Sequence, residues 1–139
     1  MECSICNNDL CNTNFKGINF KFCKNCNTVY IKTNELKKAL SYFDRIDIID
    51  FLEKTDAILI KEKNYNCSIC GQKMEKISFE DVILDRCKQC SIVAFEDGEL
   101  SKFFSKFSNE FEICSNIQFI NKYFEQSENV NTDSIKEVK

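Results

Sequence analysis

Eight of the ten cysteines fall into two sets with identical spacing, and this spacing constrains the fold of the 139-residue chain more than any other feature. In each set a C-x-x-C pair is followed, after sixteen residues, by a second C-x-x-C pair, and the two sets are offset by 64 residues. The sets are Cys3, Cys6, Cys23 and Cys26, and Cys67, Cys70, Cys87 and Cys90. Other residues keep this offset, including Phe15 with Phe79 and Leu36 with Leu100. One supersecondary unit therefore occurs twice.

The spacing of the cysteines favours metal binding. Two C-x-x-C turns at the ends of a β-hairpin can supply four thiolates to one ion at tetrahedral angles, about 2.3 Å from the metal. We therefore predict two zinc ions, one for each set of four cysteines. A four-thiolate site has no open position for water, and the chain has no histidine, the commonest general base. The sequence thus predicts structural zinc in a protein that is not an enzyme.

Two other chemistries compete with zinc for these cysteines. C-x-x-C is also the thioredoxin dithiol motif, but that motif needs a βαβ context and an exposed thiol of low pKa, and the sequence indicates neither. Iron could occupy the same four thiolates, because geometry alone does not separate the two metals, and zinc is favoured as the commoner structural ion. Cys11 and Cys114 lie outside both sets and are interpreted as free thiols packed as small hydrophobic residues.

Within each unit the local pattern predicts two paired strands, a third strand and a helix. Ile18, Phe20 and Phe22 alternate with polar residues, as in a half-buried strand. The expected hairpin turns are Lys16-Gly17 and Glu80-Asp81, the expected third strands are 29–31 and 93–95, and the expected helix N-caps are Thr33 and Asp97.

The predicted fold class is a small metal-dependent α+β protein, in which two zinc ribbons are each followed by a helix. The expected domains are a first ribbon with its helix at 1–43, a linker helix at 44–66, a second ribbon with its helix at 67–107, a C-terminal helical extension at 108–126 and a disordered tail at 127–139. Residues 57–60 are apolar and are predicted to form a short strand before the second unit.

Each unit resembles the bacterial transcription factor IIB-type zinc-ribbon (zf-TFIIB) domain. The second unit carries the resemblance in Cys67-Ser-Ile-Cys70-Gly71, Val82-Ile83-Leu84-Asp85-Arg86-Cys87 and Gly98-Glu99-Leu100, and the first in Val29-Tyr30-Ile31 and Asn34-Glu35-Leu36. It covers about residues 3–40 and 67–104. The tryptophan of that family is Tyr30 in one unit and Ala94 in the other. The resemblance implies zinc binding and defines no substrate.

Hydropathy and the N-terminal sequence bear on localisation. No apolar run approaches the roughly 18–20 residues that span a bilayer. The N-terminal residues show no basic segment followed by an apolar one, as a secretory signal has. We therefore expect a cytoplasmic protein in a reducing compartment, where structural disulfides are rare.

Charge and apolar patterning bear on the partner. The formal net charge is −3, and a phosphate-binding protein usually has a basic face. Only the first unit offers one, through Lys16, Lys21, Lys24, Lys32, Lys37 and Lys38. The C-terminal helical region carries a second apolar stripe at Ile113, Ile117, Ile120 and Phe124. The predicted function is a protein-interaction adaptor that binds a protein partner or a second copy through this stripe, and the alternative is nucleic-acid binding through the first unit.

Overall fold

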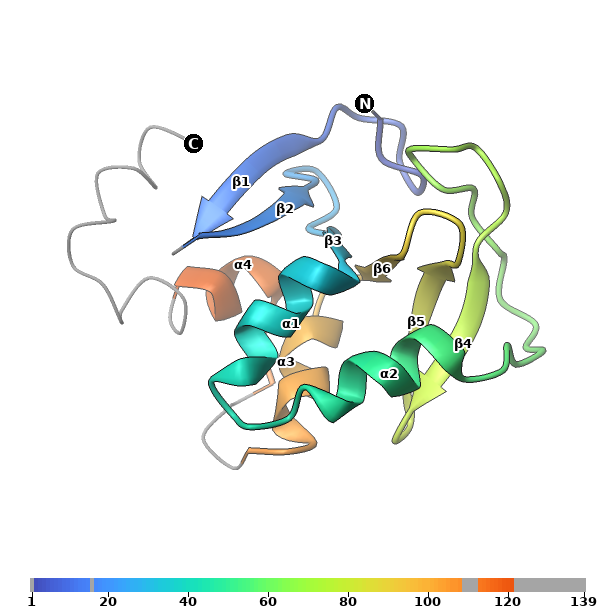
Figure 1. Cartoon of the computed structure of the whole chain (residues 1–139). Coiled ribbons are helices and arrows are strands. Elements are labelled where there is room, and N and C mark those ends of the chain that lie inside the picture. Colours follow the sequence, from blue (N-terminus) through green and yellow to red (C-terminus); the bar gives the residue numbers. More distant parts are fainter. Residues whose placement is uncertain (1, 16, 109–112, 122–139) are drawn as a thin grey trace.

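The computed structural model describes residues 2–15, 17–108 and 113–121, and its centre is a six-stranded antiparallel sheet with helices packed on one face (Figure 1). The elements in chain order are β1 Cys11–Phe15, β2 Ile18–Phe22, β3 Val29–Lys32, α1 Thr33–Ser41, α2 Asp47–Lys54, β4 Glu75–Phe79, β5 Val82–Cys87, β6 Ile92–Phe95, α3 Glu99–Ser105 and α4 Asn116–Phe119. The predicted class, a small α+β fold with two four-cysteine clusters, is confirmed at this level.

The strand order relates the two sequence repeats by a local two-fold axis. The order is β1-β2-β3-β6-β5-β4, so the third strands of the two units pair with each other at the centre of one continuous sheet. In this antiparallel pair Tyr30 lies opposite Ala94, which is the residue 64 positions later and hence its own equivalent. Val29 and Ile31 lie opposite Phe95 and Val93 in the same symmetric register. The two units thus share one sheet.

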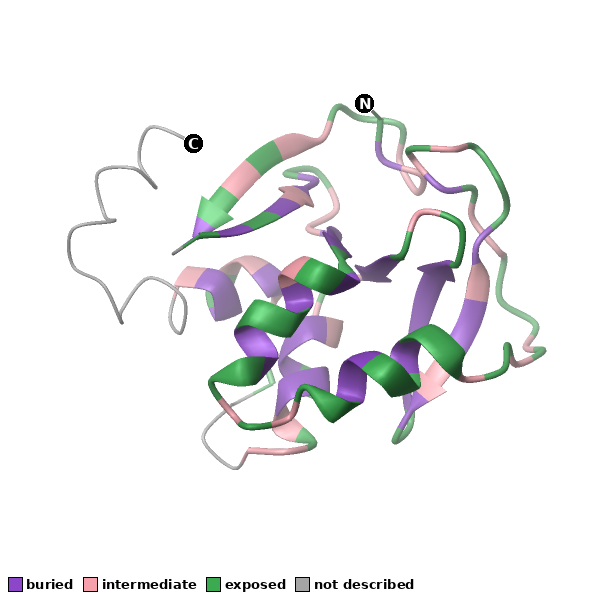
Figure 2. Ribbon diagram, viewed as in Figure 1, coloured by how far each residue is buried: buried purple, intermediate pink, exposed green. Residues whose placement is uncertain are grey.

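The helix-covered face of the sheet holds the main core. Every helix and strand contributes to this core, and its members include Phe20, Val93 and Phe103. The Phe103 ring is fully buried and lies 5.1–5.6 Å, between ring centroids, from four other phenylalanine rings. In Figure 2, α1 and α2 show buried stripes alternating with exposed ones, as expected for helices that cover a core on one side.

The hairpin turns are confirmed where the structure describes them. Phe79 pairs with Val82 across a two-residue turn, and both turn residues have positive φ, 44° at Glu80 and 76° at Asp81. Positive φ at both positions matches the right-handed twist of the flanking strands. In the first unit Phe15 pairs with Ile18, Gly17 has φ 82°, and Lys16 lies outside the described residues.

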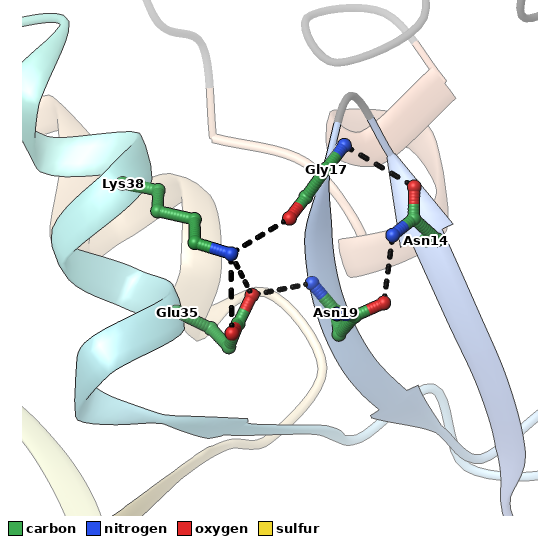
Figure 3. A network of polar contacts seen from close by, with 5 residues as sticks. All are labelled: Asn14, Gly17, Asn19, Glu35 and Lys38. Carbon is green, nitrogen blue, oxygen red and sulfur yellow. Dashed lines mark hydrogen bonds and ion pairs between the residues drawn. The ribbon is translucent and has the colours of Figure 1, made fainter.

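A polar network fastens α1 to the turn of the first hairpin (Figure 3). The Lys38 ammonium donates to the Gly17 carbonyl at 3.0 Å and to the Glu35 carboxylate at 3.0 Å. The same carboxylate accepts the backbone N–H of Asn19 at 2.8 Å, and Asn14 donates to the Asn19 side chain at 2.7 Å. These contacts hold α1 against the first hairpin.

Both predicted N-caps are wrong. Helix α1 begins at Thr33 itself, with Lys32 at the cap position, and the Thr33 hydroxyl donates to Glu53 of α2 at 2.7 Å. Helix α3 begins at Glu99, with Gly98 at the cap position and φ 87°. The Asp97 carboxylate instead accepts the backbone N–H of Asn116 at 2.8 Å. In both units the candidate cap side chain bonds to a distant element and not to its own helix.

The linker also departs from the expected elements. Its helix is α2, Asp47–Lys54, which is shorter than the predicted 44–66 segment. Residues 57–60 form no strand, and a single bond, from the Ile58 N–H to the Lys76 carbonyl at 2.8 Å, ties them to the outer edge of β4. No described helix is long and apolar enough to cross a membrane.

Two of the three described residues of the C-terminal apolar stripe pack against the core, and only Ile113 among the three is exposed. Ile120 is 2% exposed, Ile117 packs against the core, and Ile113 is 58% exposed. Helix α3 ends at Ser105, and Ser115 caps a new helix, α4, with a capping box to Gln118. Phe124, the end of the predicted extension at 108–126 and the predicted tail at 127–139 lie outside the described residues.

Candidate metal centres

The fold brings each predicted set of cysteines together. The four sulfurs of Cys3, Cys6, Cys23 and Cys26 lie within 4.8 Å of one another, and so do those of Cys67, Cys70, Cys87 and Cys90. Individual Sγ–Sγ distances are 3.4 Å for Cys6–Cys23 and 3.6 Å for Cys70–Cys87, and all eight are free thiols. Thiolates bound tetrahedrally at about 2.3 Å are roughly 3.8 Å apart. Each group could therefore hold one metal ion.

Tight backbone turns aim the cysteine pairs at a common point. In the first unit the Asn7 N–H donates to the Cys3 carbonyl at 2.9 Å, and in the second the Gly71 N–H donates to the Cys67 carbonyl at 3.0 Å. Asn7 and Gly71 have φ of 65° and 76°. Glycine, and asparagine to a lesser degree, tolerate this left-handed conformation. The residue that follows the first C-x-x-C pair of each unit thus adopts the left-handed conformation that this turn requires.

The electrostatics of the thiols require a cation if all four are to ionise. Burial raises the pKa of Cys23 to about 12, whereas hydrogen bonds from Asn8 lower the pKa of Cys6 to about 6. Burial likewise raises the pKa of Cys87. Four sulfurs this close cannot all carry negative charge without a counter-ion, and a divalent metal supplies it while releasing the protons.

The two clusters lie on the sheet face opposite the helices, which we call the metal face. Tyr30, Ile92 and Ala94 pack there with the cysteines, while their strand neighbours Val29 and Val93 point into the helix-covered core. This alternation follows from the pleat of the two central strands. The metal face and the main core therefore share the same two strands.

Tyr30 is a site residue that the sequence analysis did not assign. Its hydroxyl lies 3.2 Å from Cys3 Sγ and 2.8 Å from Ser4 Oγ, and it accepts the Ser4 N–H at 3.2 Å. A hydroxyl in this position can donate to a metal-bound thiolate and orient it. The equivalent residue Ala94 cannot, and Ser68 Oγ, the equivalent of Ser4 Oγ, is buried with no partner among the described residues. The contacts of Tyr30 join residues 26 and 27 positions apart, and no local pattern in the sequence indicates them.

The other two cysteines lie outside both clusters. Cys11 is half-buried on β1, and Cys114 packs against the core with its N–H donating to Ser101 at 3.0 Å. The described lysines of the first unit do not share one face. Lys21 and Lys32 lie on the metal face, whereas Lys24 lines a separate cavity beside α4.

Comparisons with protein-family models, with curated proteins and with solved structures give no match for this chain. The two clusters and the sheet that carries them are therefore the features that indicate a function.

Proposed function

We propose that the chain is a non-catalytic adaptor that binds another protein and is held in shape by two structural zinc ions. Each unit is, on this proposal, a zinc ribbon of the transcription factor IIB type. The observation that supports it most is the pair of four-sulfur clusters, each supplied entirely by one repeat. Four thiolates complete a tetrahedral shell and leave the metal without a position for substrate or water.

The size of the units explains why metal is needed. A unit of about forty residues rarely builds a sufficient core alone, and metal binding then supplies folding free energy. Four of the eight clustered cysteines are buried and the other four are partly exposed. The ions would fix the C-x-x-C turns at the ends of the hairpins and so hold the metal face rigid.

The charge distribution favours a protein partner over nucleic acid. Formal net charge is −3 before metal, and each four-thiolate zinc site adds about −2. Lys38 is engaged by Glu35 and the Gly17 carbonyl. Lys21 and Lys24 line different cavities and do not form one basic stripe. Nucleic-acid binding through the first unit remains the competing hypothesis that the experiment must address.

Elemental analysis of the purified chain tests the metal assignment, with two zinc ions per chain expected. One ion per chain, iron in place of zinc, or readily reducible disulfides would contradict it. Affinity capture from an extract of the source cells then tests the adaptor role, with and without nuclease treatment. We expect a protein that stays bound after nuclease, whereas capture that nuclease abolishes would assign the chain to nucleic acid.

A further inference from the structure

The internal repeat places equivalent residue pairs on the metal face of the two units, and their surroundings differ. In the second unit Lys76 of β4 and Asp85 of β5 form an ion pair at 2.6 Å, and each side chain is only 2% exposed. Their equivalents in the first unit, 64 residues earlier, are Asn12 and Lys21, which pair across β1 and β2. Asn12 is exposed and Lys21 half-buried. The same position is thus covered in one unit and open in the other.

The cover in the second unit is a segment of the chain itself, residues 58–65. The Ile58 N–H bonds to the Lys76 carbonyl at 2.8 Å, at the outer edge of the edge strand β4. The Tyr65 ring centroid lies 5.4 Å from the Lys76 ammonium, and the Tyr65 carbonyl accepts the Met74 N–H at 2.8 Å. The charge of Glu62 also favours protonated Lys76, because it helps to raise the pKa of that group.

The first unit has a groove at the equivalent place, with a volume of about 660 Å³. Lys21, Tyr30 and Lys32 of its own sheet line the groove together with Ser68 of the second unit's C-x-x-C turn. The edge strand here is β1, and no described residue donates to the outward carbonyl of Asn12, the equivalent of Lys76. An edge of this kind can accept a further extended segment.

The lining of the groove indicates the chemistry of its occupant. It presents two ammonium groups, those of Lys21 and Lys32, and one carboxylate, that of Glu35. The Glu35 carboxylate is already paired with Lys38 and accepts the Asn19 N–H (Figure 3). The buried Ser68 hydroxyl offers a further polar contact without a partner among the described residues. An anionic segment complements this surface, since charge complementarity sets specificity and association rate.

We propose that this groove binds an extended acidic segment of a partner protein, carrying an aromatic residue, in the manner in which residues 58–65 cover the second unit. The proposal rests on the adaptor function and names its docking surface. A peptide is favoured over nucleic acid because the occupant of the equivalent surface is itself a peptide. It is joined to the strand edge by the main-chain bond of Ile58 and to a lysine by an aromatic ring.

The test uses the zinc-loaded full chain and fluorescent peptides in a polarisation titration. The first peptide is the chain's own segment 56–66, the second carries Lys61→Glu and Lys63→Glu, and the third adds Tyr65→Ala to these. The second should bind most tightly. Its affinity should fall about tenfold or more in the protein variant Lys21→Glu/Lys32→Glu, because like charges then face each other.

The matched protein control is Lys37→Glu/Lys102→Glu, which makes the same change in net charge at two exposed helix positions outside the groove. It should alter affinity less than about twofold. Zinc content and circular dichroism establish that each variant is folded. If the charge-reversed groove variant fails to fold, Lys21→Gln/Lys32→Gln replaces it and should still weaken binding several-fold.

Four results would overturn the proposal. The first is no binding of any peptide, or binding that the groove variants leave unchanged. The second is stronger binding of single-stranded oligonucleotides that Lys21→Glu/Lys32→Glu abolishes, which would make the groove a nucleic-acid site. The third is a concentration-dependent dimer lost in the same variant, which would make the occupant a second copy. Capture of a protein partner that is insensitive to the groove variants would refute the groove and leave the adaptor function standing.

Discussion

Replacing Asp85 by asparagine should destabilise the protein far more than replacing its equivalent in the first unit, Lys21, by methionine. Asp85 and Lys76 are both almost fully buried, and their 2.6 Å contact is an ion pair. Burial raises the pKa of Asp85, and the charge and hydrogen bonding of Asp85 raise the pKa of Lys76 against the effect of its burial. Each group is therefore charged largely because the other is present.

The magnitude follows from the surroundings of the pair. Removing one partner leaves an uncompensated charge in the interior, which costs about 3–5 kcal/mol. The matched change Lys21→Met removes a hydrogen bond between partly exposed groups and should cost about 1 kcal/mol or less. Replacing both partners, as in Lys76→Met/Asp85→Leu, should restore stability to within about 2 kcal/mol of the wild type, since no buried charge is left.

Urea denaturation at fixed excess zinc measures these differences, because metal bound only to the folded state would otherwise shift them. Metal content should stay the same in all variants, as neither pair contains a cysteine. The prediction is wrong if Asp85→Asn costs no more stability than Lys21→Met, or if the double replacement is as unstable as the single one. Either result would show that residues 58–65 do not keep water from the pair.

Three further predictions concern the metal centres and a half-buried carboxyl. Cys87→Ser should lose one of two zinc ions by elemental analysis, because each cluster draws all its sulfurs from one unit, and loss of both would contradict this. Tyr30→Phe should weaken zinc about tenfold at the first site alone in a chelator competition, since its hydroxyl contacts Cys3. Burial raises the pKa of Glu99 from 4.5 to about 8, so the folded state retains a proton that the unfolded chain releases, and stability falls as pH rises between these values. Glu99→Gln should remove this slope, worth on the order of 2 kcal/mol after solvent screening, in urea titrations at about pH 5 and pH 8.

The parts of the fold that the sequence predicts are those with a local signal. The alternation at β2, the two-residue turn at Glu80-Asp81 and the grouping of the cysteines all depend on residues close together in the chain or on the 64-residue offset. Each can be inferred without knowledge of distant contacts. The hairpins and the four-cysteine clusters can be predicted from the sequence for this reason.

The pairing of β3 with β6 joins residues more than sixty positions apart, and no local pattern specifies its register. The apolar character of both third strands indicates a central position in a sheet, since such strands are buried on both faces. In the structure β6 is buried at every residue. The two N-cap predictions are wrong for the same physical reason. Thr33 and Asp97 bond to Glu53 and Asn116, partners that only the tertiary fold supplies.

The symmetric pairing of Tyr30 with Ala94 has a consequence for how such a chain could arise. A single unit that paired its third strand with that of an identical molecule would form a symmetric dimer with this strand order. Such a dimer must place the same residue at both positions on its axis, so that one substitution changes both halves at once. Gene duplication and fusion lift this restriction. One copy can then keep the tyrosine that reaches Cys3, while the other carries alanine and leaves space beside Ser68.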